Sequence, residues 1–198
     1  NGDTALHELC RIEPCSKKLK LIKNKYIRKL VHNGAELNIQ NTDGNTPLHL
    51  AIQISKYQKN VKLSQKEIVK ILLNANAKID IQDAGGNTVL HLAVKKEFPQ
   101  IVKVLLKFNG GQDLPDIKNN DGCTALHIAA QCNFPEAIYY MLDAGADFDI
   151  KNSQGNTALH LAFRFSSMNG VQQLLKKGAN LDSQNNSGET PLEVSPIG

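Results

Sequence analysis

Short apolar segments recur along the chain, and their spacing is that of helices rather than of strands. In the segment that begins at Pro47, Leu48 and Ala51 or Ile52 fall on one helical face, and Thr46 fits the N-cap position before it. A denser apolar segment follows at residues 68–73 and ends before Asn76. This pairing predicts two short helices and a turn, and the turn residue is a Gly or Asn because positive φ favours these residues. The polar stretch after each turn predicts an extended loop or hairpin rather than a sheet.

One hexamer marks the start of each such pair. The form G-x-T-x-L-H begins at Gly2, Gly44, Gly86, Gly122 and Gly155, and a variant, GETPLE, begins at Gly188. The intervals are 42, 42, 36, 33 and 33 residues, which indicates insertions into a fixed unit of 33 residues. Alignment on the predicted turn residues, which are Gly34, Asn76, Asn109, Gly145 and Gly178, places nine extra residues between the helices of the first two units. The three extra residues of the third unit follow Asn109.

The period, the T-P-L-H and T-A-L-H motifs and the G-A-D turn closely resemble those of ankyrin-repeat proteins. The resemblance implies an all-α solenoid of stacked helix-turn-helix units with hairpin loops. It covers residues 1–198 as a single domain with repeats at about 1–42, 43–84, 85–120, 121–153 and 154–186 and a partial sixth at 187–198. The chain departs from the family pattern at Glu193, where His is expected, and in the long inserts. The missing initiator Met and the short sixth repeat lead us to expect a fragment of a longer chain.

Five of the six histidines lie three residues after a motif threonine, and this position allows the side chain to reach back to the N-cap. The resemblance implies a structural Thr–His hydrogen bond in each repeat. No Cys or carboxylate occurs at matching offsets, which argues against a metal site. The chain also lacks the common catalytic and nucleotide-binding motifs, so we expect neither an enzyme nor a cofactor. The structural set comprises Thr46, His49, Thr88, His91, Thr124, His127, Thr157 and His160.

In the ankyrin family, partners are bound on a concave face by the residues around each motif glycine and at the end of each first helix. Transferred to this chain, the strongest candidates are Asn45, Gln53, Ile54, Asn87, Lys95, Lys96, Gln131, Asn156, Arg164 and Phe165. The same family positions also hold Thr42, Asp43, Ala84, Gly85, Asn120, Asp121, Cys123, Cys132, Ser153 and Gln154. Arg and aromatic residues carry much of the binding energy at protein interfaces, which draws attention to Arg164 and Phe165. For Phe165, packing beneath the following repeat is an equal alternative.

Charge is unevenly distributed along the chain. Residues 1–80 hold 14 Lys and Arg against 7 Asp and Glu, whereas residues 81–198 hold 9 against 12. Residues 16–30 contain no acid, and Leu19, Ile22, Tyr26 and Leu30 recur there at helical spacing, which predicts an extended amphipathic second helix with a lysine-rich outer face. This face is either simply solvated or a patch for an acidic protein, nucleic acid or anionic lipid. Its candidate residues are Lys17, Lys18, Lys20, Lys23, Lys25, Arg28, Lys56, Lys59 and Lys62.

The sequence therefore predicts a protein-binding module, expected to be monomeric. One alternative is the targeting arm of a larger effector enzyme whose catalytic domain lies outside these residues, because Lys- and Asn-rich ankyrin arrays resemble those that intracellular bacteria deliver into host cells. Another alternative is anionic-ligand binding through the lysine-rich inserts. Four cysteines without a C-x-x-C pair favour a reducing compartment. We therefore expect an intracellular location in the cytoplasm or nucleus, or in the host-cell cytosol for a secreted effector.

Overall fold

All regular structure in the described part of the chain is helical, as the all-α prediction requires. The structure is a computed structural model that describes residues 2–12, 16–53, 61–108 and 113–194. It divides into two compact units, Asn1–Leu92 and Ala93–Gly198, with the boundary inside helix α5 (Val89–Lys95). Each unit buries its own set of apolar side chains, such as Leu48 and Ile68 in the first and Leu126 and Ile138 in the second.

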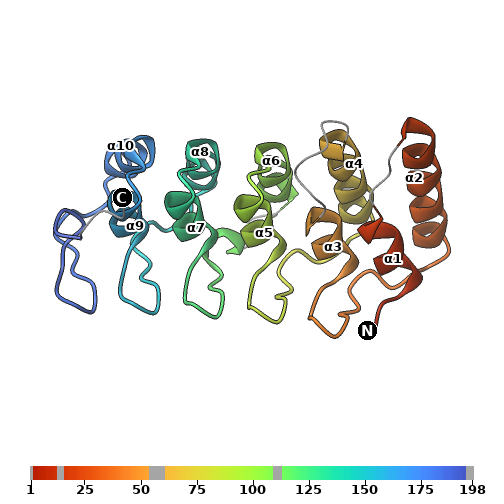
Figure 1. Cartoon of the computed structure of the whole chain (residues 1–198), viewed down its shortest axis with the longest axis horizontal. Helices are drawn as coiled ribbons and strands as arrows, with labels where there is room; N and C mark the ends of the chain where they lie inside the picture. Colours follow the sequence, from red (N-terminus) through yellow and green to blue (C-terminus); the bar gives the residue numbers. More distant parts are fainter. Residues whose placement is uncertain (1, 13–15, 54–60, 109–112, 195–198) are drawn as a thin grey trace. The chain divides into compact units, whose positions relative to one another are not determined.

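The first unit consists of two helix pairs that pack in two layers (Figure 1). The first helices, α1 (Ala5–Arg11) and α3 (Pro47–Gln53), pack against each other. The second helices, α2 (Lys17–His32) and α4 (Val61–Asn74), do the same. Each first helix also contacts the second helix of its own pair, so that every helix buries an apolar face between its neighbours.

The second unit repeats this arrangement (Figure 1). Its second helices, α6 (Pro99–Phe108), α8 (Pro135–Asp143) and α10 (Met168–Lys176), pack in sequence order. Its first helices, α7 (Ala125–Gln131) and α9 (Ala158–Arg164), form the other layer, and the 3-10 helix η1 (Leu114–Asp116) contacts α7. Asn109, the predicted turn residue of the third unit, lies outside the described residues.

Positive φ occurs at the predicted turn residues that the structure describes. The φ angles are 79° at Gly34, 65° at Asn76, 86° at Gly145 and 96° at Gly178. The inserts of the first two units lengthen the second helices: α2 has 16 residues and α4 has 14, against 9 in both α8 and α10. The prediction of an extended second helix in the first repeat is therefore confirmed.

The sequence predicted that the apolar stripe of α2 would face inward, and this prediction is wrong. Leu19, Ile22 and Tyr26 are 46%, 39% and 54% exposed, whereas Ile27 and the polar residues Lys23 and Asn24 are buried. Lys23 is no part of an exposed basic patch, since its Nζ donates hydrogen bonds to the carbonyl oxygens of Cys10 (3.1 Å) and Ile12 (2.6 Å). The carbonyls at a helix end lack partners within the helix, and a buried cation satisfies them at the end of α1.

The Thr–His pair is present in the first five motifs. In each, the histidine Nδ1 lies 2.8 to 2.9 Å from the threonine Oγ1 and accepts the threonine backbone N–H. Because Nδ1 accepts, the ring proton must reside on Nε2. Nε2 of His49 donates to the carbonyl oxygen of Asn87 (3.2 Å), and that of His160 donates to Glu189 (3.1 Å). The same bond joins His7 and His127 to the following repeats, so each of these rings holds two repeats together.

The sixth motif keeps only half of this arrangement. Glu193 Oε2 accepts hydrogen bonds from the backbone N–H and the hydroxyl of Thr190, both at 2.8 Å. A carboxylate at this position caps the turn as the histidine does, but it is an acceptor and cannot supply the donor that binds a carbonyl of another repeat. Glu193 thus caps the N-terminal turn of its own repeat, as the motif histidines do, but within the described residues it forms no bond of the kind that joins a histidine to the following repeat.

The hydrogen bonds that join successive repeats are made by neutral histidine rings. We therefore predict that the free energy of unfolding decreases in mild acid. Burial lowers the pKa of His49 and of His160, so the folded state favours the neutral rings. Their contribution is complete above the unfolded-state pKa of about 6.5 and is lost as the pH falls through the lower folded-state values. The free energy of unfolding in urea should therefore decrease between pH 7.5 and 5.5, by at most about 1.4 kcal/mol per pH unit for each histidine.

Two variants make this test specific. His49→Gln should reduce the pH dependence, because the titrating ring is gone. His32→Gln should not, because His32 is exposed and outside the motif. Equal pH slopes for His49→Gln and the unmodified protein would contradict the assigned role.

Candidate partner-binding site

Each hairpin is shaped by an Asn or Asp that accepts two backbone N–H groups ahead of it. Asn119 Oδ1 accepts from Asp121 and Cys123, and Asn152 Oδ1 accepts from Gln154 and Asn156, at 3.0 Å in every case. Asn41, Asp83 and Asn185 do the same in the other described hairpins. These side chains fix the backbone of each tip at the positions that the family resemblance assigns to partner binding.

Successive hairpins are also bonded directly to one another. In the second unit the Ser153 N–H donates to the Asp121 carbonyl (3.1 Å), and the Asn186 N–H donates to that of Gln154 (3.0 Å). The motif glycines permit this approach: Gly155 has a φ of 78°, and a Cβ there would lie 2.6 Å from the Asn186 nitrogen. The three hairpin tips at residues 119–123, 152–156 and 185–189 are therefore held in register.

A pocket of about 310 Å³ lies in the second unit beside these tips. The hairpins and Gln131 at the end of α7 contribute polar groups, and α9 with its C-cap residue contributes Leu161, Arg164 and Phe165. Six of the eight lining residues occupy positions that the family resemblance indicated. The lining comprises Asp121, Cys123, Gln131, Asn152, Gln154, Leu161, Arg164 and Phe165. The two additional residues are the hairpin anchor Asn152 and Leu161 of α9, which the sequence did not single out.

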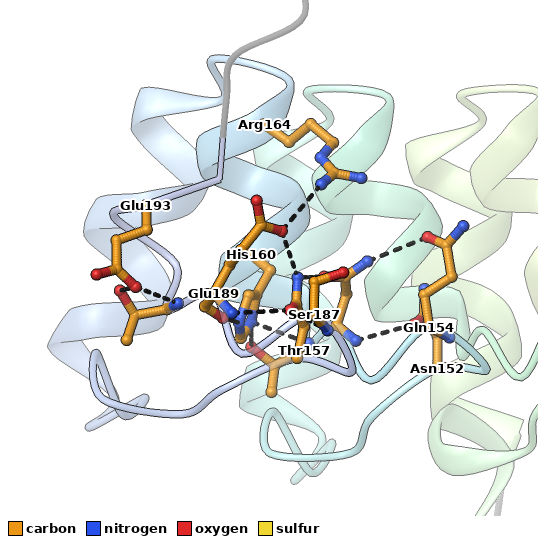
Figure 2. A network of polar contacts seen from close by, with 11 residues as sticks. Asn152, Gln154, Thr157, His160, Arg164, Ser187, Glu189 and Glu193 are labelled. Atoms are coloured by element: carbon orange, nitrogen blue, oxygen red, sulfur yellow. Dashed lines mark hydrogen bonds and ion pairs between the residues drawn. The ribbon is translucent and has the colours of Figure 1, made fainter.

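The side chains of the pocket combine apolar and polar surface. Leu161 is 5% exposed and Phe165 is half-buried, whereas Asp121, Gln131 and Gln154 are exposed. Arg164 is held beside Glu189, with 3.8 Å between Nη2 and Oε2 (Figure 2). A concave surface with an apolar part and a few fixed polar groups is typical of binding sites.

Behind the pocket, an amide network joins its walls to the next hairpin (Figure 2). Asn185 Nδ2 donates to Asn156 Oδ1 (2.9 Å) and to Glu189 Oε2 (3.0 Å), and Asn156 Nδ2 donates to Gln154 Oε1 (3.1 Å). Asn156 is only 1% exposed. The prediction that the Asn156 side chain contacts a partner is therefore wrong. This side chain forms hydrogen bonds within the protein and holds Gln154 in place.

Asn45 requires the same correction. It is 5% exposed, and its Oδ1 accepts a hydrogen bond from Gln53 Nε2 (2.8 Å). Asn87 is half-buried and donates from Nδ2 to Asp83. Lys95 is exposed and Lys96 half-buried, and Ile54 lies outside the described residues.

The remaining lysine-rich candidates are distributed over two helices and one undescribed segment. Lys18, Lys25 and Arg28 are exposed on α2, whereas Lys20 is half-buried with its Nζ 3.9 Å from Glu67 Oε2. Lys17 and Lys62 belong to α2 and α4. Lys56 and Lys59 lie outside the described residues. The structure thus brings three of the predicted cations to the exposed side of one helix.

Cys10 of α1 and Cys123 of the pocket are poorly suited to nucleophilic chemistry. Burial raises the pKa of the Cys10 thiol to about 12 and raises that of the Cys123 thiol, so both remain protonated near neutral pH. Among the residues whose placement the structure gives, no group of three or more His, Cys, Asp or Glu could hold a metal ion. In the same part of the chain, no helix has both the length and the apolar character that a membrane crossing requires.

A family model described as ankyrin repeats, with three copies, matches residues 58–152 and 133–195, which is well over half of the chain. The chain belongs to the ankyrin-repeat family. Ankyrin repeats are generally protein–protein interaction modules and are typically non-catalytic, so the pocket belongs to a domain type that binds proteins. No curated protein matched the chain.

The register of the hairpins can be tested at Gly155. Gly155→Ala combines a positive φ with a clash against the backbone of the next hairpin, whereas Gly178→Ala has a positive φ but no neighbour within 4 Å. Gly178→Ala should cost about 1–2 kcal/mol of unfolding free energy, from the left-handed backbone alone. Gly155→Ala should cost about 1–3 kcal/mol more, because a packed backbone must move. Urea denaturation measures both, and equal losses would contradict the close hairpin contact.

Proposed function

We propose that this protein binds a partner protein through the surface that the hairpin tips and first helices form within residues 121–165. The observation that carries the proposal is the pocket of the second unit, where Asp121, Gln131, Arg164 and Phe165 meet around one concavity. The repeat motif accounts for the neighbouring threonines, histidines and glycines as structural groups. Asp121, Gln131 and Phe165 are not among these structural groups, and they line the pocket.

The size and composition of the pocket favour a protein partner over a small ligand. Its volume of about 310 Å³ is at the lower limit for small-molecule sites, which typically span about 300–1,000 Å³. Arg164 and Phe165 are of the residue types that dominate protein interfaces. A partner would insert one or two side chains here and extend over the adjoining hairpins.

The test is affinity capture with the double variant Arg164→Ala, Phe165→Ala. Binding to a captured partner should weaken by at least about tenfold, since truncation of an interface anchor commonly costs more than about 1–2 kcal/mol. The matched control is Lys107→Ala, Phe108→Ala, which removes an exposed cation and an exposed phenylalanine from the end of α6, outside the pocket. Circular dichroism should be unchanged in both variants. Unaltered affinity in the first variant would refute the proposal.

A second candidate function, the binding of an anionic ligand, rests on helix α2. This helix contains no acid, and Lys18, Lys25, Arg28 and Lys29 are exposed on it. A row of cations without compensating carboxylates attracts polyanions, and the attraction weakens with salt. This surface belongs to the first unit and the pocket to the second, so separate variants test the two candidates.

Heparin retention tests the second candidate. The triple variant Lys18→Glu, Lys25→Glu, Arg28→Glu should elute from immobilised heparin at a clearly lower salt concentration than the unmodified protein, because polyanion affinity follows the number of contacting cations. The control reverses three exposed lysines of the second unit, Lys107, Lys176 and Lys177, with the same change in net charge. Equal elution of the two triple variants would show that only net charge matters and would exclude a site on α2.

A further inference from the structure

We propose that the pocket of the second unit recognises a basic segment of the partner, in which a Lys or Arg side chain pairs with Asp121 and an adjacent apolar side chain covers Leu161 and Phe165. This inference rests on the proposed function and adds the chemistry of the partner to it. It follows from four features of the pocket: a carboxylate without a partner, a guanidinium already paired, an uncommitted amide, and apolar surface.

Asp121 supplies the free carboxylate. Its backbone N–H donates to Asn119 Oδ1 and its carbonyl accepts from Ser153, so the residue is anchored on both sides of its side chain. Within residues 113–194, its carboxylate accepts no hydrogen bond and forms no ion pair, and the residue is exposed at the pocket. An anchored but unpaired carboxylate can bind a cation without first giving up another contact.

Arg164 does not cancel this charge. Its guanidinium lies 3.8 Å from the carboxylate of Glu189 (Figure 2). Asp121 in the pocket lining is a second negative group. Two cations of the neighbouring hairpins, Lys118 and Lys151, are held by the backbone carbonyls of Lys151 and Gln184. The thiol of Cys123 is protonated because burial raises its pKa. Of the two charged residues in the pocket lining, Arg164 is thus paired with Glu189 and Asp121 is not, and the unpaired carboxylate favours a cation.

The wider charge distribution has the same sign. Residues 93–198 hold 9 Lys and Arg against 11 Asp and Glu, a net charge of −2. Residues 1–92 hold 14 against 8, a net charge of +6. An acidic segment would thus meet repulsion at the pocket, whereas a basic segment would be attracted to it.

The other polar groups suit a peptide backbone. The Gln131 side-chain amide is exposed at the pocket, where it offers a donor and an acceptor. The guanidinium of Arg164 approaches Glu189 through one nitrogen, Nη2, which leaves donors that can reach a carbonyl oxygen. Leu161 and Phe165 provide the surface for one apolar side chain. Together these groups suit a short peptide segment that carries a basic residue beside an apolar one.

The experiment uses two probe peptides, Ac-Gly-Lys-Leu-Gly-NH₂ and Ac-Gly-Glu-Leu-Gly-NH₂, titrated to millimolar concentration into the ¹⁵N-labelled chain and followed by NMR. The lysine peptide should shift the amide resonances of Asp121 and Cys123 and the side-chain amide of Gln131. It should bind about three- to fivefold more tightly than the glutamate peptide, which is the range expected of one exposed ion pair. Asp121→Lys should reverse the order of the two affinities.

The control is Asp149→Lys, which makes the same change in net charge at an exposed hairpin aspartate outside the pocket lining. It should keep the preference for the lysine peptide. Equal affinities of the two peptides, or reversal by Asp149→Lys as well, would overturn the basic-segment inference. If Arg164→Ala, Phe165→Ala still abolishes partner binding in that case, the proposed function stands alone. If this double variant also leaves partner binding intact, both proposals fail.

Discussion

Stacking in each unit depends on the hydrogen bond from a motif histidine to a backbone carbonyl of the following repeat. Isolated helices of seven residues, such as α7 and α9, are too short to be stable in water, so they persist only where neighbours bury them. The histidine meets this need in two ways. Its Nδ1 closes the N-terminus of its own helix, and its Nε2 reaches the next hairpin, as His127 does at Asn156 (2.9 Å). Because both ring nitrogens form hydrogen bonds within the protein, neither is left to bind a ligand.

Side chains that form hydrogen bonds within the repeat cannot also contact a partner, so recognition groups lie at other positions. In each hairpin anchor, such as Asn119 or Asn152, the side-chain oxygen accepts hydrogen bonds from the backbone N–H groups two and four residues ahead. The residue two positions after each anchor then has its backbone fixed and lies exposed. Four residue types occur at this position: the residues are Asp43, Gly85, Asp121, Gln154 and Ser187. A constant backbone that presents variable side chains is what a recognition surface requires.

The sequence alone predicted the repeat, the Thr–His pairs and the turns, because these depend on contacts within about one repeat. The positive φ at Gly145 and the bond between Thr124 and His127 are local, so spacing and residue type suffice to predict them. The inner face of α2 was not predictable in this way. Periodicity detects an apolar stripe but not its orientation, and here Lys23 is turned inward by the carbonyls at the end of α1. Lys23 and the carbonyl groups that it contacts are more than ten residues apart in the sequence, so the periodicity of α2 does not reveal the contact.

The candidate site shows the same limit. Family positions led to six of the eight pocket residues, yet they also pointed to Asn45 and Asn156, which are buried. An asparagine carries both a donor and an acceptor, so sequence cannot tell whether a hairpin or a partner uses them. At Asn156 the answer comes from Asn185, 29 residues away, whose amide fills the acceptor. Once that network holds Gln154 in place, specificity is left to groups that no neighbour engages. In the second unit Asp121 is such a group, and its exposed carboxylate, rather than the repeat motif, would give the pocket a preference for a cation.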